Sequence, residues 1–206
     1  MSTYKISYFN LMGRAELSRI MLSAADKEFE DDRFEKEEWP ERKPNTPCGQ
    51  VPVLTHGDKQ IPQSMAIARY LARDLDLYGK DNMENTMCDV VLECINDVIT
   101  ETVKLFFEQD ETKKAKPDIE KNLMEVIYPR FLGHLEKLLD KNNGEWLVGD
   151  KLSVADLAFF DLMNRLTAKK GVSVFESSPK MKKHLEKVTN IPGVQKWLEK
   201  RPVTDM

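Results

Sequence analysis

Residues 4–24, YKISYFNLMGRAELSRIMLSA, decide the fold that we expect for this chain. The segment Tyr4–Phe9 is short, rich in aromatic and β-branched residues and alternating in polarity, which is typical of a strand. Asn10–Gly13 predicts a turn. A helix should follow, because apolar residues recur at the i, i+3, i+4, i+7 spacing of one helical face, at Leu17, Ile20, Met21 and Ala24.

The residues up to position 78 continue this mixed pattern. Residues 29–34 predict a second strand in an acid-rich run, and residues 38–50 predict a long irregular loop because they contain three prolines and a glycine. Residues 51–55 and 59–62 predict two strands joined by the hairpin signal Gly57-Asp58. Ser64 opens a helix whose apolar face contains Ala68, Leu71, Ala72 and Leu75. Residues 1–78 are therefore expected to form a small α/β domain, followed by a linker at 76–82.

After this linker the sequence is helical in pattern throughout, which predicts an all-helical domain over residues 82–206. Residues 83–109 and 118–141 are long amphipathic segments. Ser153 and Asp156 form a near variant of the capping box, and Leu152 and Leu157 occupy the positions of a hydrophobic staple. This pattern predicts that a helix begins at Val154.

Composition excludes several classes of protein. The 206 residues carry a net charge of −4 and are 41% hydrophobic, so we expect neither wholesale disorder nor a nucleic-acid partner. The longest stretch without charged residues, 44–57, is short and broken by prolines, so no membrane span is expected, and the start of the chain lacks the pattern of a secretory signal. The cysteines, Cys48, Cys88 and Cys94, are odd in number and form no C-x-x-C pair, which fits a reducing, cytoplasmic setting.

Three places in the α/β domain offer a ligand site, each with a simpler alternative. Tyr8 ends the first strand, where open α/β sheets bind ligands; its phenol could donate to an anion, or its hydroxyl could simply face water. Pro52 permits a cis peptide bond that would present the Val51 backbone to an extended peptide, although a trans proline is also allowed there. Gln63 and Ser64 either cap the next helix or, with its free N–H groups, bind a carboxylate.

In combination, these residues resemble the glutathione transferases, specifically the sigma class. The resemblance covers essentially the whole chain and rests on these segments, in order: Tyr8-Phe-Asn-Leu-Met-Gly-Arg14-Ala-Glu16, Trp39, Lys43, Gln50-Val-Pro52-Val-Leu54, Gln63-Ser64, Leu147-Val-Gly-Asp150 ahead of Ser153-x-x-Asp156, and Arg201-Pro202-Val203. It implies a thioredoxin-like N-terminal domain that binds glutathione, an all-helical C-terminal domain, and a homodimer. The implied reaction is conjugation of the glutathione thiolate to small apolar electrophiles, with reduction of organic hydroperoxides as a further activity.

Carried over residue by residue, the resemblance makes Tyr8 the catalytic residue, which donates a hydrogen bond to the glutathione sulfur. Arg14 adds positive potential near the sulfur, and Gln50 completes the site. The remaining contacts follow the parts of the tripeptide: Trp39 and Lys43 for the glycyl end, Val51 ahead of cis-Pro52 for the cysteinyl backbone, Gln63 and Ser64 for the γ-glutamyl carboxylate, and Asp97 of the partner subunit for the γ-glutamyl amine.

The electrophile pocket that the resemblance implies is mostly apolar, with a lining of Phe9, Met12, Gly13, Ile99, Ala158, Leu162 and Met206. Some sigma-class members are prostaglandin D synthases with a metal-binding acidic trio, which here reads Glu93, Asn96 and Asp97, so we expect no metal. Those enzymes also have a tryptophan and a tyrosine where this chain has Lys104 and Ala158. A glutathione-dependent prostaglandin isomerase and a non-catalytic, crystallin-like or ligand-binding protein remain the alternatives.

Overall fold

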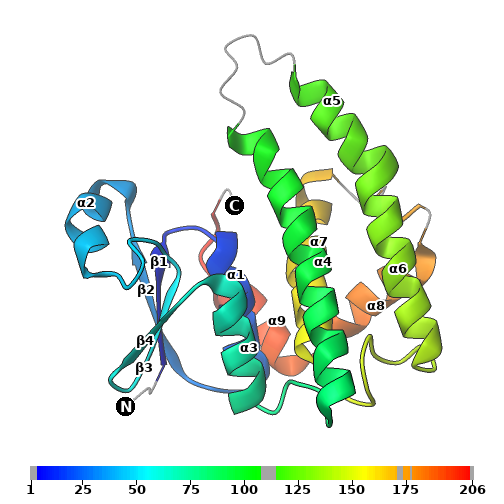
Figure 1. The fold of residues 1–206 in the computed structure, drawn as a ribbon, viewed down its shortest axis with the longest axis horizontal. Helices are drawn as coiled ribbons and strands as arrows, with labels where there is room; N and C mark the ends of the chain where they lie inside the picture. Colours follow the sequence, from blue (N-terminus) through cyan, green and yellow to red (C-terminus); the bar gives the residue numbers. More distant parts are fainter. Residues whose placement is uncertain (1–3, 108–114, 171–173, 177, 205–206) are drawn as a thin grey trace. The chain divides into compact units, whose positions relative to one another are not determined.

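The computed structural model describes residues 4–107, 115–170, 174–176 and 178–204. The chain forms two compact units (Figure 1). The first unit contains the residues up to Tyr78 together with those from Thr189 onward, and the second contains residues 79–188. The expected combination of an α/β domain and an all-helical domain is therefore present, but the α/β unit is built from two separate stretches of chain.

A four-stranded mixed sheet in the order β2-β1-β3-β4 forms the centre of the first unit. Strand β1 (Tyr4–Phe9) pairs in parallel with β2 (Phe29–Phe34) and antiparallel with β3 (Val53–His56), and the predicted hairpin joins β3 to β4 (Lys59–Pro62). The alternation predicted for β1 is observed, because Tyr4, Ile6 and Tyr8 are buried while the residues between them are partly exposed.

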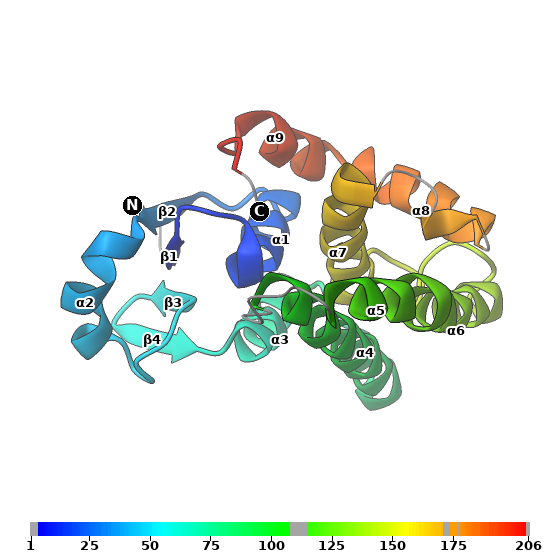
Figure 2. The same cartoon turned by 90° about the horizontal axis from the view of Figure 1, so that it is seen from above.

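Helices cover both faces of this sheet. Helices α1 (Glu16–Ala24) and α3 (Ser64–Asp74) lie on one face, and α2 (Trp39–Arg42) lies on the other (Figures 1 and 2). The region predicted as an irregular loop contains α2 between two 3-10 turns, Lys36–Glu38 and Lys43–Asn45. Pro40 and Pro44 stand in the first turns of these short helices, where the missing N–H of proline costs no hydrogen bond.

Helix α9 (Pro192–Lys200) belongs to the first unit, although residues 189–206 were expected in the helical domain. The indole N–H of Trp197 donates to the Glu16 carboxylate at 2.8 Å, and Arg201 donates to the same oxygen at 3.0 Å. The Ser23 hydroxyl donates to the carbonyl of Gly193 at 2.7 Å, and Trp197 also contacts the ring of Phe29. These contacts hold α9 along α1, so the last described helix completes the sheet domain.

The second unit is entirely helical in its described residues. Its helices are α4 (Asn82–Phe107), α5 (Ala115–Asn122), α6 (Tyr128–Lys141), α7 (Val154–Lys170) and α8 (Pro179–Thr189). A π-helical turn at Leu123–Ile127 joins α5 to α6, next to Pro129, which cannot donate the regular helical hydrogen bond. None of the described helices has the length and apolar character needed to cross a membrane.

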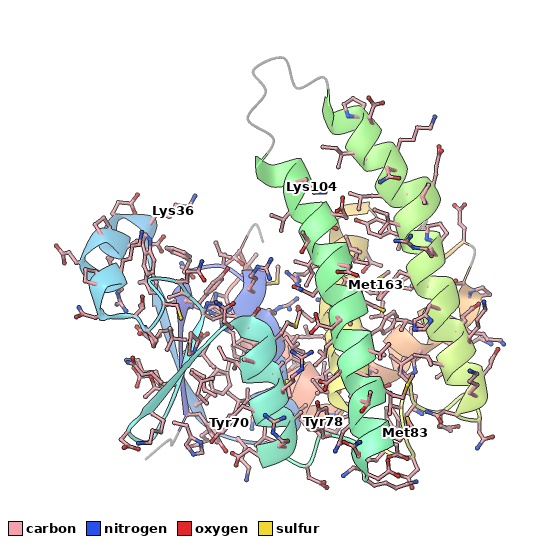
Figure 3. All side chains as sticks on the ribbon, viewed as in Figure 1. Lys36, Tyr70, Tyr78, Met83, Lys104 and Met163 are labelled. Carbon is pink, nitrogen blue, oxygen red and sulfur yellow. The ribbon has the colours of Figure 1, made fainter. Side chains whose placement is uncertain are left out.

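Helix α7 is the central helix of this unit. Residues 153–163 are all buried, Met163 among them (Figure 3). The helix begins at Val154, as the capping box predicts, and the Asp156 carboxylate accepts the backbone N–H of Ser153 at 2.9 Å and its hydroxyl at 2.8 Å. The same carboxylate accepts the backbone N–H of Leu147 at 2.9 Å and bonds to His184 at 2.8 Å. The cap therefore also joins α7 to the preceding loop and to α8.

Candidate active site

Tyr8 lies at the carboxyl end of β1, and its side chain is almost completely buried, with 9% exposure. Its hydroxyl oxygen accepts the backbone N–H of Arg14 at 3.3 Å, so the phenol keeps its own proton available for another acceptor. Gly13 makes this contact possible: its φ is +45°, and a Cβ at this position would stand 2.7 Å from the Tyr8 hydroxyl. The guanidinium of Arg14 is exposed, and the contact of this residue with Tyr8 runs through its backbone.

The segment before β3 and the start of α3 form the next part of the site. The Val51–Pro52 peptide is cis, as the resemblance implies. Gln63 has a φ of +72°, which is uncommon for a residue with a side chain and occurs preferentially at functional sites. Its side-chain amide donates to that of Gln50 at 3.1 Å. These two predicted residues therefore lie together.

Ser64 is the first residue of α3, and no side chain caps this helix. The first N–H groups of a helix lack partners within the helix, and the helix dipole adds positive potential at the same place. The start of α3, beside the exposed side chain of Gln63, is thus suited to bind a carboxylate.

Trp39 and Lys43 lie on the α2 segment, on the other side of the sheet from α1. Trp39 stacks on Phe34, with ring centroids 6.1 Å apart and an interplanar angle of 11°, and meets Phe9 edge-on at 5.5 Å. Lys43 is exposed and runs beside Gly49. Phe9, which we expected in the electrophile pocket, is half-buried and packs against Phe34 and Trp39, and its role in binding an electrophile stays a prediction.

The other predicted pocket residues are distributed over both units. Met12 is half-buried in the turn after β1, Ile99 is half-buried on α4, and Ala158 and Leu162 are buried on α7. Met206 lies outside the described residues. The role of these residues in binding an electrophile remains a prediction.

The acidic positions of α4 and the neighbouring lysine are solvent-facing in this unit. Asp97 is exposed, which leaves it available to a partner. Lys104 is also exposed and donates to Glu101 at 2.6 Å (Figure 3). Among the described residues, no group of three or more His, Cys, Asp or Glu side chains is arranged to hold a metal ion.

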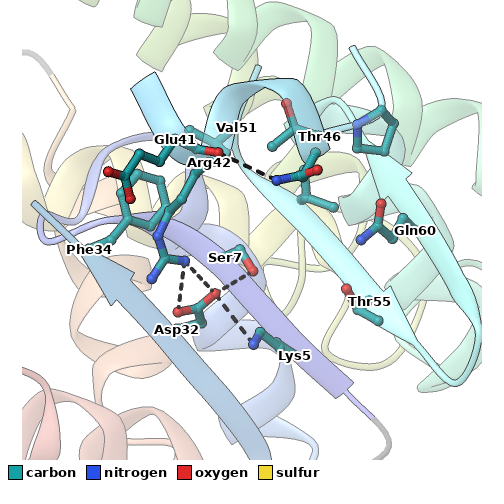
Figure 4. Close-up of a pocket in the computed structure, with 13 residues that line it drawn as sticks. Lys5, Ser7, Asp32, Phe34, Glu41, Arg42, Thr46, Val51, Thr55 and Gln60 are labelled. Carbon is teal, nitrogen blue, oxygen red and sulfur yellow. Dashed lines mark hydrogen bonds and ion pairs between the residues drawn. The ribbon is translucent and has the colours of Figure 1, made fainter. Parts of the chain in front are cut away.

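A pocket of about 570 Å³ lies on the face of the sheet opposite Tyr8, beneath the α2 segment (Figure 4). Asp32 receives the Ser7 hydroxyl at 2.8 Å and Arg42 at 3.1 Å, and lies 3.5 Å from Lys5. Although burial of Asp32 opposes ionisation, these donors and positive charges hold the pKa of its carboxyl below the usual value. Arg42 also lies over the Phe34 ring, 4.5 Å from its centre. Its ion pair with Asp32 and this ring contact both join α2 to the sheet. Val51 lines the same pocket.

The two cysteines of the helical unit are poor nucleophiles. Burial raises the pKa of the Cys88 thiol to about 11, and it also raises that of Cys94. Both thiols are therefore almost fully protonated at neutral pH. These two cysteines are therefore poor candidates for a nucleophile of the protein itself. The phenol of Tyr8, at the end of β1, is better suited to activate the thiol of a bound ligand.

Two family profiles match the chain. One describes the glutathione S-transferase N-terminal domain and matches residues 4–73, and the other describes the C-terminal domain and matches residues 96–201. The chain belongs to the glutathione S-transferase family. The transferase is 35% identical over 206 residues to a glutathione S-transferase of Anopheles gambiae, with 100% of both chains covered.

Two further relatives place this transferase near the sigma class. It is 32% identical over 216 residues to S-crystallin 4 of Enteroctopus dofleini, covering 100% of both chains. The solved structure of prostaglandin synthase D of Nilaparvata lugens is similar with a TM-score of 0.86 and 38% identity, over 98% of this chain and 100% of that one. The expected sigma-like membership and fold are confirmed.

Sequence reasoning missed a group of buried charges in the transferase. Glu16 and Arg19 of α1 are fully buried, with 0% exposure each. Arg19 donates to the carbonyls of Leu11 and Met12 at 2.9 and 3.4 Å, and so holds the turn that leads from Tyr8 to Arg14. No local signal revealed this burial, because Glu16 and Arg19 stand in a helix that mixes apolar residues with serines.

Proposed function

We propose that this transferase uses Tyr8 to activate the thiol of glutathione and joins the sulfur to small apolar electrophiles. The observation that carries the proposal is the Tyr8 hydroxyl, which is held by the Arg14 N–H at 3.3 Å at the carboxyl end of β1 and retains its own proton for donation. A free thiol ionises near pH ~8.5, so only a small fraction is thiolate at neutral pH. A hydrogen bond to the ionised sulfur favours the thiolate, which is the reacting form.

The proposed step balances in a simple way. The thiol loses its proton to solvent, the sulfur forms a bond to the electrophilic carbon, and the bond to the leaving group breaks with its electron pair. With an organic hydroperoxide, two glutathione thiols are oxidised to one disulfide, while the peroxide is reduced to an alcohol and water. The role of the protein is to hold the sulfur in place and to stabilise its charge.

We assign the other glutathione contacts to the segment before β3, the start of α3 and the α2 segment. The free N–H groups at the start of α3, with Ser64 and the exposed Gln63, suit the γ-glutamyl carboxylate. The neighbouring Gln50 amide is joined to that of Gln63 at 3.1 Å, which supports a common surface for this end of the tripeptide. The cysteinyl backbone is assigned to Val51 and Pro52, and the glycyl end to Trp39 and Lys43.

The proposal includes a homodimer in the cytoplasm. All three cysteines, Cys48, Cys88 and Cys94, are free, which fits a reducing compartment. Asp97 is exposed on α4 and is assigned to the glutathione bound by the partner subunit. The variant Asp97→Ala should therefore weaken glutathione binding in a calorimetric titration while the dimer persists in sedimentation analysis. Unchanged affinity would exclude the cross-subunit contact.

The decisive experiment is a conjugation assay with a chromogenic aryl halide, comparing the unmodified enzyme with Tyr8→Phe. We expect kcat to fall by about 10- to 150-fold, which corresponds to the loss of a hydrogen bond to a charged group worth roughly 1.5–3 kcal/mol, with a small change in glutathione affinity. Full activity in Tyr8→Phe would remove this residue from the mechanism.

The same assay separates the two alternative roles. Relatives of this chain are named as a prostaglandin synthase and a crystallin. If the unmodified protein binds glutathione but conjugates no electrophile, isomerisation of a prostaglandin endoperoxide is the next reaction to assay. A protein that binds glutathione and performs neither reaction would be a carrier or a structural protein.

A further inference from the structure

Five charged side chains of the first unit form one connected cluster of ion pairs, and one of them, Arg19, lies near the Tyr8 ring. Arg19 of α1 donates through Nε to Asp31 of β2 at 2.7 Å, and Arg33 of β2 donates through Nε to the other oxygen of Asp31 at 2.7 Å. Arg19 and Arg201 both donate to Glu16, at 3.3 and 3.0 Å. Within the described residues, these five form ion pairs with no other charged group. Three guanidinium groups thus share two carboxylates, and the cluster carries one excess positive charge.

The excess charge is buried rather than solvated. Arg19 has 0% side-chain exposure and Arg33 has 11%. Among the described residues, Nη2 of Arg19 and both Nη1 and Nη2 of Arg33 are buried without a hydrogen-bond partner. Buried charge is poorly screened, and buried donors without partners favour nearby negative charge. A positive potential therefore extends from this cluster into its surroundings.

Tyr8 lies near two arginines of this cluster. Arg33 is the register partner of Tyr8 across the parallel β1–β2 pair, so the two side chains leave the sheet on the same face. The guanidinium carbon of Arg19 lies 6.0 Å from the centre of the Tyr8 ring. Arg14 contacts the phenol through its backbone N–H, and its side chain is exposed and therefore better screened.

We infer that Arg33 and Arg19 are electrostatic positioning residues, whose buried excess charge acts through Tyr8 to favour the thiolate of bound glutathione. This inference rests on the proposed function and deepens it. Arg19 has an additional geometric role through the carbonyls of Leu11 and Met12. Arg33 makes its one described hydrogen bond to Asp31, so it isolates the effect of charge more cleanly.

The test compares Arg33→Met with Asp31→Asn, because both substitutions break the same ion pair but change the net charge in opposite directions. The ultraviolet absorbance of the thiolate is titrated for glutathione bound to each folded variant, and the pH profile of kcat/KM is measured beside it. Arg33→Met removes one unit of positive charge, which should raise the apparent pKa of the bound thiol by about one unit. Asp31→Asn should lower it, and Arg33→Lys should stay near the unmodified enzyme.

Several outcomes would overturn the inference. If Arg33 and Asp31 had a merely structural role, Arg33→Met and Asp31→Asn would shift the apparent pKa of the bound thiol in the same direction, or would lower kcat/KM equally at every pH. Arg73→Met is the matched control, because it removes an exposed arginine of the same unit that lies over Tyr78, and its profile should be unchanged. If the bound thiol has the same apparent pKa in Tyr8→Phe as in the unmodified enzyme, the proposed role of Tyr8 is wrong. If Tyr8→Phe alters it but Arg33→Met does not, only the inference about the arginines fails.

Discussion

Glu16→Gln offers a direct test of how much the buried charges stabilise the first unit. Glu16 has 0% exposure and accepts hydrogen bonds from Trp197 at 2.8 Å, Arg201 at 3.0 Å and Arg19 at 3.3 Å. Glutamine has nearly the same volume, so no cavity forms. The substitution removes the negative charge and turns one acceptor into a donor that faces other donors. The two arginines then lose a buried partner.

Breaking a buried ion pair by removing one member costs about 3–5 kcal/mol. For a chain of this size, each kcal/mol lowers Tm by roughly 2–4 °C, so the expected loss is about 6–20 °C. Trp197→Phe removes one donor and leaves the ion pairs intact, so its cost should be smaller, about 1.5–3 kcal/mol. The loss of unfolding free energy in each variant is measured by urea unfolding followed by circular dichroism, a signal that does not depend on the fluorescence of Trp197.

The control is Glu41→Gln, which neutralises an exposed glutamate in the same unit and should change stability by less than ~0.5 kcal/mol. If Glu16→Gln lies within about 1 kcal/mol of the unmodified protein, the network around Glu16 contributes little net stability, and desolvation of the charges offsets their attraction.

Three further predictions concern the turn after β1, the cap of α7 and the pocket beneath α2. Gly13→Ala should lower kcat by about 10- to 100-fold in steady-state assays, because the new Cβ would stand only 2.7 Å from the Tyr8 hydroxyl and would push it aside. Unaltered kinetics would show that the turn relaxes without moving Tyr8. Ser153→Ala should cost about 0.5–2 kcal/mol in urea unfolding, whereas Ser153→Thr should keep most of the cap; equal losses would contradict a capping role. Asp32→Asn should destabilise the protein at neutral pH, where the lowered pKa keeps Asp32 charged, and the difference should fade as the pH falls through that pKa, because protonation removes the same charge from the unmodified protein. A deficit that does not vary with pH would refute this assignment.

Local patterns in the sequence predicted most of the elements, because local contacts create those elements. The hairpin at 51–62 and the start of α7 at Val154 each depend on a few neighbouring residues whose chemistry is specific. The short helix at Trp39–Arg42 was missed, because prolines at 40, 44 and 47 indicate a loop, while proline is also tolerated in the first turn of a helix.

Long-range contacts were not predictable in the same way. Arginine and glutamate are usually exposed, so Glu16 and Arg19 could not be recognised as buried until Trp197 and Arg201 were seen beside them. The same absence of a local signal explains why residues 189–206 were expected in the helical domain. The position of Tyr8 could be predicted from the strand alone, whereas the arginines behind it required the β1–β2 register.

The return of α9 to the first unit has a consequence for biosynthesis. Ribosomes deliver the sheet and α1 first, then the helical unit, and only then the residues that contact Glu16, which lie 181 and 185 positions further along. Until Trp197 and Arg201 emerge, the Glu16 carboxylate lacks these two donors, and the Phe29 ring lacks its contact with Trp197. The helical unit can therefore fold during translation while the sheet domain waits for α9. Premature termination before residue 189 would leave a sheet domain exposed to chaperones and proteases.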